Sequence, residues 1–446
     1  MTLDVTLDRD HFVVRHGELA KSAGTPAWLA SLRQKAISHY QGIGLPTTHQ
    51  EEWRFTNTQT LNGTRFEPAP AATAAGIDIA AIERLTLGGD LFRIGLVNGR
   101  FSPELTNLAG LPAGVTVQTL SDALRASSPI VEANLGRHAR WENNAYSALN
   151  TALFEEGVVV HVGKGVVLEK PIHVLHVTIP GSGSPGVTHL RNLIVAEESA
   201  QVRVIESYVG RRGTYWTNAI TEIVAGDNAV ADHYRLNRES DGAFHTGRVD
   251  MFAGRSGVTN THTITFGGLL TRNDTGVVLG GEGADSTMNG LTVIGGKQLV
   301  DNHTSIDHAV PHCTSHELYK AVLDGTARTV FNGRILVRKD AQKTDSKQTN
   351  KNLLLSDKAL VNTNPQLEIY ADDVKCTHGA TIGQLDESMI FYLRSRGIGE
   401  VAAQHLLTYA FANDIVERIQ VPALRERLND YLIHRLRDED GAEEAL

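Results

Sequence analysis

Between residues 157 and 382 the chain alternates short Val, Ile and Leu runs with small polar turns, and segments with helical spacing are few. Apolar runs bounded by Gly, Asn, Asp and Ser are typical of β-strands. The turns recur loosely, because their successive starts lie 34, 29, 28, 27, 43 and 32 residues apart. A period in this range indicates stacked structural repeats. The turns begin at Gly163, Glu197, Gly226, Gly254, Gly281, Asp324 and Ser356.

The repeats favour a parallel β-helix. Most of the turns follow an apolar strand, such as residues 193–196 or 223–225. A chain that coils back over itself places equivalent strands above one another, so that their inward side chains form one continuous core. A β-sandwich is the alternative, since it uses similar strands at shorter intervals.

Both flanks of this region have helical character. Residues 1–140 are mixed, with one amphipathic stripe from Trp28 to Tyr40 that ends at Gly42 and Gly44. After residue 385 three helices are expected. The first is capped by Asp386 and ended by Gly397, the second carries apolar residues at steps of four, and the third opens with a proline.

The pattern therefore predicts a mainly β protein in three parts. An N-terminal mixed α/β region covers residues 1–140, a parallel β-helix core covers residues 141–385, and a helical region covers residues 386–446. The last part ends in an acidic tail, residues 438–444, for which no packed structure is expected.

Composition narrows the function classes. Lys and Arg total 42 against 51 Asp and Glu, and this net charge of −9 disfavours a generic nucleic-acid binder. No apolar run approaches the roughly 18 residues of a membrane span, and the N-terminus has no secretory pattern, so a cytoplasmic protein is expected. Two cysteines, Cys313 and Cys376, exclude a disulfide framework and favour free thiols.

Two nucleotide-binding patterns fail on inspection. Gly181-Ser-Gly-Ser-Pro-Gly186 matches a dinucleotide fingerprint, but a strand follows it where a helix should begin. Gly295-Gly-Lys-Gln298 resembles the end of a phosphate-binding loop, yet Leu291 replaces its first glycine and Gln298 its Ser/Thr. We expect no ATP hydrolysis by this chain itself.

Two clusters could carry metal chemistry. The segment from Asp301 to His316 holds four histidines and Cys313, although its spacing fits no closed zinc site and hydrogen-bonded ladders are the alternative. Further on, Cys376 and His378 are two residues apart, so they would share one face of a strand and could hold a soft metal or a sulfur species. The alternative there is a buried thiol beside a hydrogen-bonded histidine.

Longer segments carry a more specific signal. They include Phe391-Tyr-Leu-Arg-Ser-Arg-Gly397, Asp301-Asn-His303, Pro311-His-Cys-Thr-Ser315 and residues 46–56, 329–345, 348–356 and 365–381. Together they resemble the SufB/SufD family of iron–sulfur cluster assembly proteins, over most of the chain and most densely between residues 299 and 398. SufB-like members carry a cysteine where this chain has Leu393, so the chain is more similar to the SufD branch.

The resemblance implies a right-handed parallel β-helix that acts as a non-catalytic scaffold with SufB and two copies of the ATPase SufC. It implies pairing with SufB through the β-helix and SufC docking through helices of residues 386–436. His378 matches the family histidine proposed to hold a nascent iron–sulfur cluster at the SufB interface, while Cys376 is a weaker candidate. Reduced flavin is associated with such complexes, and a homodimer of the isolated chain stays open. A β-helix enzyme acting on polysaccharides and a purely structural solenoid are the competing functions.

Overall fold

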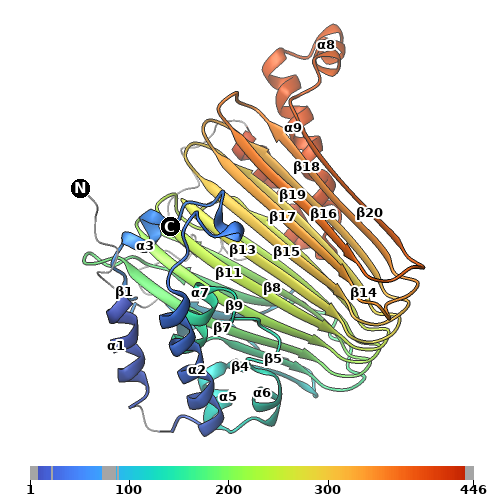
Figure 1. The fold of residues 1–446 in the computed structure, drawn as a ribbon. Coiled ribbons are helices and arrows are strands. Elements are labelled where there is room, and N and C mark those ends of the chain that lie inside the picture. The colour runs from blue at the N-terminus through green and yellow to red at the C-terminus, as the bar shows by residue number, and fades with distance from the viewer. Residues whose placement is uncertain (1–8, 22–23, 73–86, 88–89, 437–446) are drawn as a thin grey trace.

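The computed structural model describes residues 9–21, 24–72, 87 and 90–436, and the predicted acidic tail at residues 438–444 lies outside them. Within the described residues the chain winds into a solenoid made of two ten-stranded sheets (Figure 1). Successive strands alternate between the sheets, so each coil adds one strand to each of them. We call the sheet that ends on β19 the first sheet, and the sheet that ends on β20 the second.

The strands of the first sheet, in spatial order, are β4 (Val115–Thr119), β5 (Val158–Val162), β7 (Gly186–Ala196), β9 (Tyr215–Ala225), β11 (Phe244–Ala253), β13 (Leu270–Leu279), β15 (Leu299–His308), β17 (Arg328–Val337) and β19 (Leu360–Ile369), with β1 (Glu67–Pro68) beside β7. Those of the second sheet are β3 (Arg100–Asn107), β2 (Phe92–Val97), β6 (Ile172–Thr178), β8 (Gln201–Gly210), β10 (Val230–Arg238), β12 (Val258–Thr265), β14 (Asp285–Ile294), β16 (Thr314–Leu323), β18 (Asp345–Leu354) and β20 (Lys375–Gly383).

The strands from β5 to β20 pair in parallel, and antiparallel pairing in the described chain is confined to β2 with β3 and β4 with β5. In-register partners such as Phe244 and Leu270, or Val159 and Leu193, fix the coil length at 26 to 34 residues. The predicted parallel β-helix is thus confirmed. The β-sandwich alternative is wrong, because its two sheets would be antiparallel.

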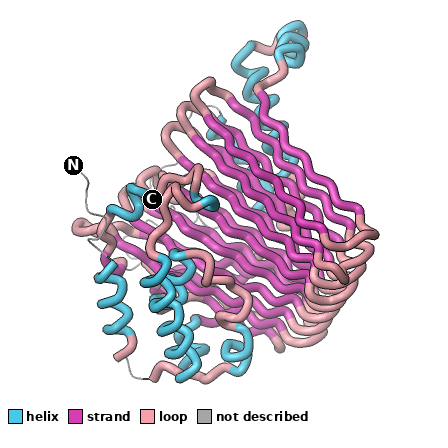
Figure 2. Tube along the Cα trace, in the orientation of Figure 1, coloured by secondary structure: helices cyan, strands magenta, loops and turns pink. Residues whose placement is uncertain are grey.

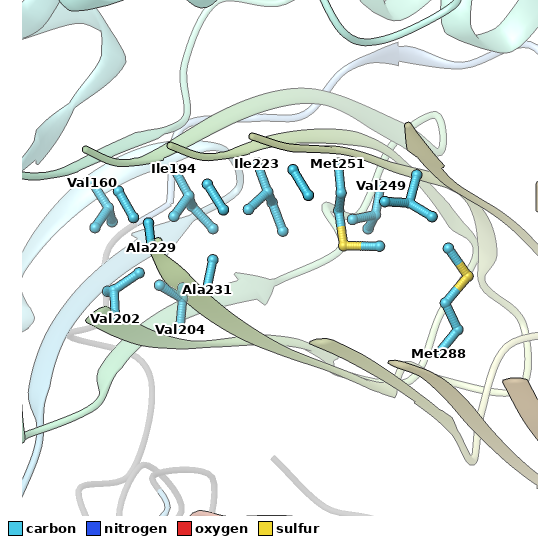
Figure 3. Close-up of a cluster of buried hydrophobic side chains, with 14 of the residues drawn as sticks. Val160, Ile194, Val202, Val204, Ile223, Ala229, Ala231, Val249, Met251 and Met288 are labelled. Atoms are coloured by element: carbon cyan, nitrogen blue, oxygen red, sulfur yellow. The ribbon is translucent and has the colours of Figure 1, made fainter. Parts of the chain in front are cut away.

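The inward side chains of successive coils stack in columns. Val160, Ile194, Ile223 and Met251 follow one another at one register position of the first sheet, facing aliphatic residues of the second (Figure 3). All four are at most 2% exposed. Because equivalent residues stack in register, each added coil extends the core without changing its cross-section. Each side chain buried in this way contributes roughly 1.5–3 kcal/mol to stability.

The predicted turns sit where the chain passes between the sheets. Ser199, Asn228 and Ser256, each the third residue of its turn, adopt positive φ angles of 60°, 55° and 50°. The turns starting at Asp324 and Ser356 lie on the opposite edge of the solenoid, between β16 and β17 and between β18 and β19. The irregular interval of 43 residues therefore marks a change of edge. The turns on the first edge continue at residues 309–313, 338–344 and 370–374, which the sequence pattern did not predict.

Helices flank the solenoid at both ends of the sequence (Figure 2). Before the core come α1 (Arg9–Leu19), α2 (Ala27–Ile43), the short 3₁₀ helix η2 (Glu51–Trp53), α3 (Gln59–Gly63), α5 (Leu120–Arg125), α6 (Pro129–Asn134) and α7 (Ala145–Leu153). The predicted stripe from Trp28 to Tyr40 forms α2, which ends before Gly44 at φ 66°. The domain boundaries at residues 140 and 385 stay a prediction. The strands β2, β3 and β4, which end before residue 120, already belong to the two sheets of the solenoid.

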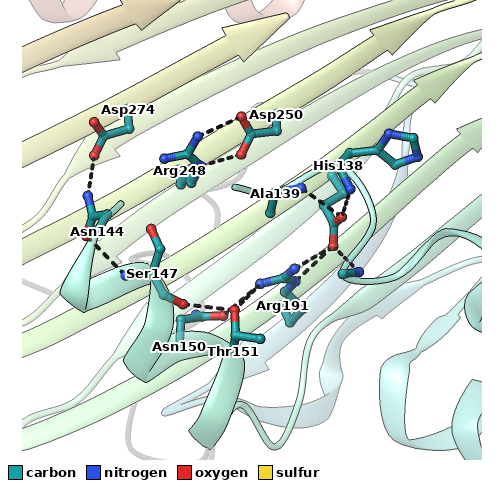
Figure 4. A network of polar contacts seen from close by, with 12 residues as sticks. His138, Ala139, Asn144, Ser147, Asn150, Thr151, Arg191, Arg248, Asp250 and Asp274 are labelled. Atoms are coloured by element: carbon teal, nitrogen blue, oxygen red, sulfur yellow. Dashed lines mark hydrogen bonds and ion pairs between the residues drawn. The ribbon is translucent and has the colours of Figure 1, made fainter. Parts of the chain in front are cut away.

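The N-terminal helices cover the outer face of the first sheet. A buried ion pair fixes this contact: Arg191 Nη2 lies 2.6 Å from Glu222 Oε1, and neither side chain is exposed (Figure 4). The same carboxylate accepts hydrogen bonds from the backbone N–H groups of residues 136, 138 and 139. The loop before α7 is therefore tied to the middle of β9.

The C-terminal helices are α8 (Glu387–Ser395), α9 (Glu400–Val416) and α10 (Pro422–Leu436), as the sequence predicts. Asp386 caps α8 by accepting the N–H of Ser388, and Gly397 follows its end at φ 87°. Buried residues of α9 and α10, among them Ile415 and Leu428, pack on the outer face of the second sheet. None of the helices in the described part of the chain is both long and apolar enough to cross a membrane.

Candidate functional site

The solenoid ends on two strands that each have one free edge. Among the described residues β19 pairs with β17 alone, and β20 pairs with β18 alone. Large apolar side chains are exposed on and beside these strands, with Leu360 and Ile382 each 49% exposed and Tyr370 64% exposed. An exposed edge with apolar side chains is a template for pairing with another chain. We refer to β19, β20 and these side chains as the open end.

Cys376 and His378 both lie on β20 and, being two residues apart, share one face of the strand. They stack on Ser346 and Gln348 of β18, which are 0% and 1% exposed, so this face points into the solenoid. No further strand of the described chain stacks on β20. His378 is therefore exposed, and Cys376 is half-buried against the core. The structure therefore brings the two predicted residues together at the open end.

The electrostatic surroundings of these two residues differ. Burial raises the pKa of the Cys376 thiol, and the nearby carboxylate of Asp345 raises it further. The thiol is thus protonated at neutral pH, in the form that binds metals poorly. No group of three His, Cys, Asp or Glu side chains in the described chain converges as a metal site.

The histidine-rich segment from residue 301 to residue 316 does not converge. Asp301 and His303 lie on the outer face of the first sheet, where Arg272 Nη1 approaches Asp301 Oδ2 at 2.7 Å. His308 points inward and shares a hydrogen bond of 2.9 Å with Ser315, whereas His316 is exposed. Residues that are close in sequence therefore face different sides of a strand or different strands. The hydrogen-bonding alternative describes this segment.

A charged cluster inside the solenoid escaped the sequence analysis. His245 lies 2.6 Å from both Glu239 Oε2 and Arg235 Nη2, and His233 Nε2 lies 3.4 Å from Glu206 Oε2. Burial favours the neutral acid, yet the charges of His233 and Arg235 lower the pKa of Glu206 to about 2. The coil register could have indicated part of this cluster, because it places Arg235 beside Glu206, 29 residues earlier in the chain. The contacts of His245 join β11 to the end of β10, across the two sheets, and no register pairing predicts them.

One further buried carboxyl lies near the open end. Glu317 on β16 is 3% exposed, and burial raises its pKa to about 7. Its Oε2 accepts a hydrogen bond of 2.7 Å from Gln348, the residue directly beneath His378. This polar column was also missed, because Glu317 has no motif around it.

A second exposed surface lies on the C-terminal helices. The helix α8 projects beyond the sheets (Figure 1) and exposes Met389, Phe391 and Tyr392 at 54%, 73% and 57%. Val401 and Leu406 on α9 are exposed at 62% and 47%. Large apolar side chains gathered on a projecting helix mark a surface for a protein partner.

Comparison with known proteins agrees with this architecture. The SufBD core domain of the SUF system for FeS cluster assembly matches residues 178–411, and the SufBD N-terminal region matches residues 13–174. An iron–sulfur cluster assembly SufBD family protein of Synechocystis sp. is 35% identical over 422 residues, covering 92% of each chain. The iron–sulfur cluster assembly protein SufD of Escherichia coli is 32% identical over 88% of this chain and 90% of its own. The SufD protein of Bacillus subtilis is 27% identical, over 96% and 98%. This chain therefore belongs to the SufBD family of iron–sulfur cluster assembly proteins.

Proposed function

We propose that this chain is a non-catalytic scaffold subunit that pairs with SufB, docks the ATPase SufC and supports the assembly of an iron–sulfur cluster in the cytoplasm. The observation that carries the proposal is the position of His378 on a free strand edge. A histidine sealed inside the solenoid could not meet a partner, whereas this one is exposed where another β-helix can add its strands.

The proposed chemistry is ligation of a nascent cluster, which is the cargo of the complex. A neutral imidazole can bind iron while SufB supplies thiolates. Cys376 shares the face of His378, but its raised pKa makes it the weaker ligand. The absence of a converging ligand set within the described residues is consistent with a cluster that both subunits hold.

The proposed SufC surface consists of α8, α9 and α10. Its support is the exposed apolar set on α8, together with the attachment of α9 to the solenoid through the 2.7 Å ion pair between Lys320 and Asp414. Binding an ATPase there would couple its movement to the second sheet. ATP-driven approach of two SufC subunits would then shift SufB against this chain and open their shared seam.

Co-purification with SufB and SufC, followed by anaerobic reconstitution and absorption spectroscopy, tests the proposal. We expect His378→Ala to retain both partners and to lose cluster formation. The matched control is His312→Ala, an exposed histidine on the turn before β16. Full cluster formation in the His378 variant would contradict the ligand role. Undiminished assembly with a SufC variant that binds but does not hydrolyse ATP would contradict the coupling.

A further inference from the structure

We propose that Gln348 and Glu317 are positioning residues that hold the imidazole ring of His378 in one orientation and one tautomer. This inference rests on the proposed role of His378 as a cluster ligand. It assigns a task to two buried residues that lie beneath the open end, Gln348 on β18 and Glu317 on β16.

The three residues form one column. Glu317 on β16, Gln348 on β18 and His378 on β20 occupy equivalent register positions in adjacent parallel strands. Such strands lie about 4.8 Å apart, so side chains on the same face stack directly. Gln348 is 1% exposed while its neighbour Lys347 is exposed, which shows that the column points into the solenoid.

One polar atom of the Gln348 side chain has a hydrogen-bond partner, and the other has none among the described residues. Its Nε2 donates a hydrogen bond of 2.7 Å to Glu317 Oε2. Its Oε1 is buried and has no hydrogen-bond partner among the described residues. A buried carbonyl oxygen without a partner is destabilising. The next coil offers one ring donor at this register position, the imidazole of His378.

The amide of Gln348 also has little freedom to turn away. Gly333 lies across the interior on β17, and a Cβ atom at that position would fall 2.4 Å from Gln348 Nε2 and 2.7 Å from Phe331 Cζ. The glycine thus makes room for the amide within an otherwise filled layer. A flip of the amide would turn its Nε2 away from the carboxylate of Glu317.

This arrangement has a chemical consequence for His378. In a neutral imidazole one nitrogen carries the proton and the other a lone pair. A ring N–H that donates to Gln348 Oε1 leaves the other nitrogen unprotonated and ready to bind iron. Second-shell hydrogen bonds of this kind set the tautomer and orientation of histidine ligands.

NMR of the full chain with isotope-labelled histidine tests the inference without a cluster. The His378 signals are assigned with His378→Ala and recorded at about pH 8.5, where an ordinary imidazole is neutral. We expect the two ring nitrogens of the wild type to have well-separated shifts, as in one tautomer. In Gln348→Met, a near-isosteric apolar variant, the shifts should converge as two tautomers exchange.

Two further variants make the result decisive. Lys347→Met is the matched control, because it changes the adjacent outward position of the same strand, and it should leave the ring shifts unchanged. Glu317→Gln should shift the ring signals as well, since a neutral partner no longer fixes the amide direction, and it decides the matter if Gln348→Met does not fold. Unchanged ring shifts in both column variants would overturn the inference.

Cluster assembly in the complex separates this inference from the proposed function. We expect Gln348→Met to lower the rate of cluster formation about tenfold with SufB and SufC still bound. If His378→Ala assembles clusters normally while Gln348→Met changes the ring signals, the ligand role fails and the positioning stands. If His378→Ala abolishes assembly and Gln348→Met changes neither the signals nor the rate, the positioning alone is refuted.

Discussion

Replacing Glu317 by Gln is expected to stabilise the protein above neutral pH. Glu317 is 3% exposed, and burial raises its pKa from 4.5 to about 7. Below the unfolded pKa the carboxyl of Glu317 is protonated in both the folded and the unfolded protein, so it does not reduce stability. The protein loses stability as the pH rises from the unfolded pKa through the folded pKa, because folding then requires burying the charge or taking up a proton. The full cost above pH 7 corresponds to about 3 kcal/mol.

Urea unfolding followed by tryptophan fluorescence measures this effect at about pH 5 and about pH 8. Glu317→Gln should match the wild type within roughly 1 kcal/mol at the lower pH and exceed it by roughly 2–3 kcal/mol at the higher. Glu169→Gln, on an exposed turn, is the control and should show no such difference. If the stabilities of Glu317→Gln and the wild type differ by the same amount at both pH values, Glu317 does not titrate in this range and the reasoning is refuted.

Three other predictions address the remaining features. Glu222→Gln leaves Arg191 buried without its counter-charge and should destabilise the chain by about 3–5 kcal/mol in urea unfolding; a loss below 1 kcal/mol would contradict the ion-pair argument. Phe391→Asp, on exposed α8, should weaken SufC binding at least about tenfold by calorimetry and change stability by less than about 0.5 kcal/mol. In β20 the N–H groups of alternate residues, beginning with Lys375, point towards β18, so the N–H of Ala380 points to the free edge. Ala380→Pro removes this N–H and should leave the fold intact. It should weaken pairing with SufB, or self-pairing of the isolated chain, as measured by light scattering. Unchanged pairing would place the interface elsewhere.

The sequence could predict the repeating part of the fold because each coil repeats the same local chemistry. Polar turns with a left-handed third residue, such as Ser199 and Asn228, are readable without knowing the register. The caps of α8 are equally local, since Asp386 and Gly397 act within one turn of the helix. The edge on which a turn lies is not local, and the turn at Asp324 was therefore assigned to the wrong series.

The site was predictable only in part. Cys376 and His378 were paired correctly because a two-residue spacing on a strand fixes a shared face. The column of Glu317, Gln348 and His378 was not predictable, because its members are about 30 residues apart and meet only through the register. The converse error arose between residues 301 and 316, where closeness in sequence suggested convergence but alternation along β15 sends neighbouring side chains to opposite faces.

The two ends of the solenoid differ in a way that stability alone does not explain. At the N-terminal end both sheets finish on antiparallel strands, β3 and β4, with helices beside them. At the other end β19 and β20 expose Leu360 and Ile382, and a carboxyl that costs stability at neutral pH lies two strands below His378. Soluble proteins normally protect free strand edges, and buried acids are normally paired with cations. Both exceptions fall in the last coils, where the proposed ligand is. Their coincidence is what a partner-completed site requires, because a cap on this end would exclude the partner, and an apolar residue at position 317 could not orient the amide beneath the ring.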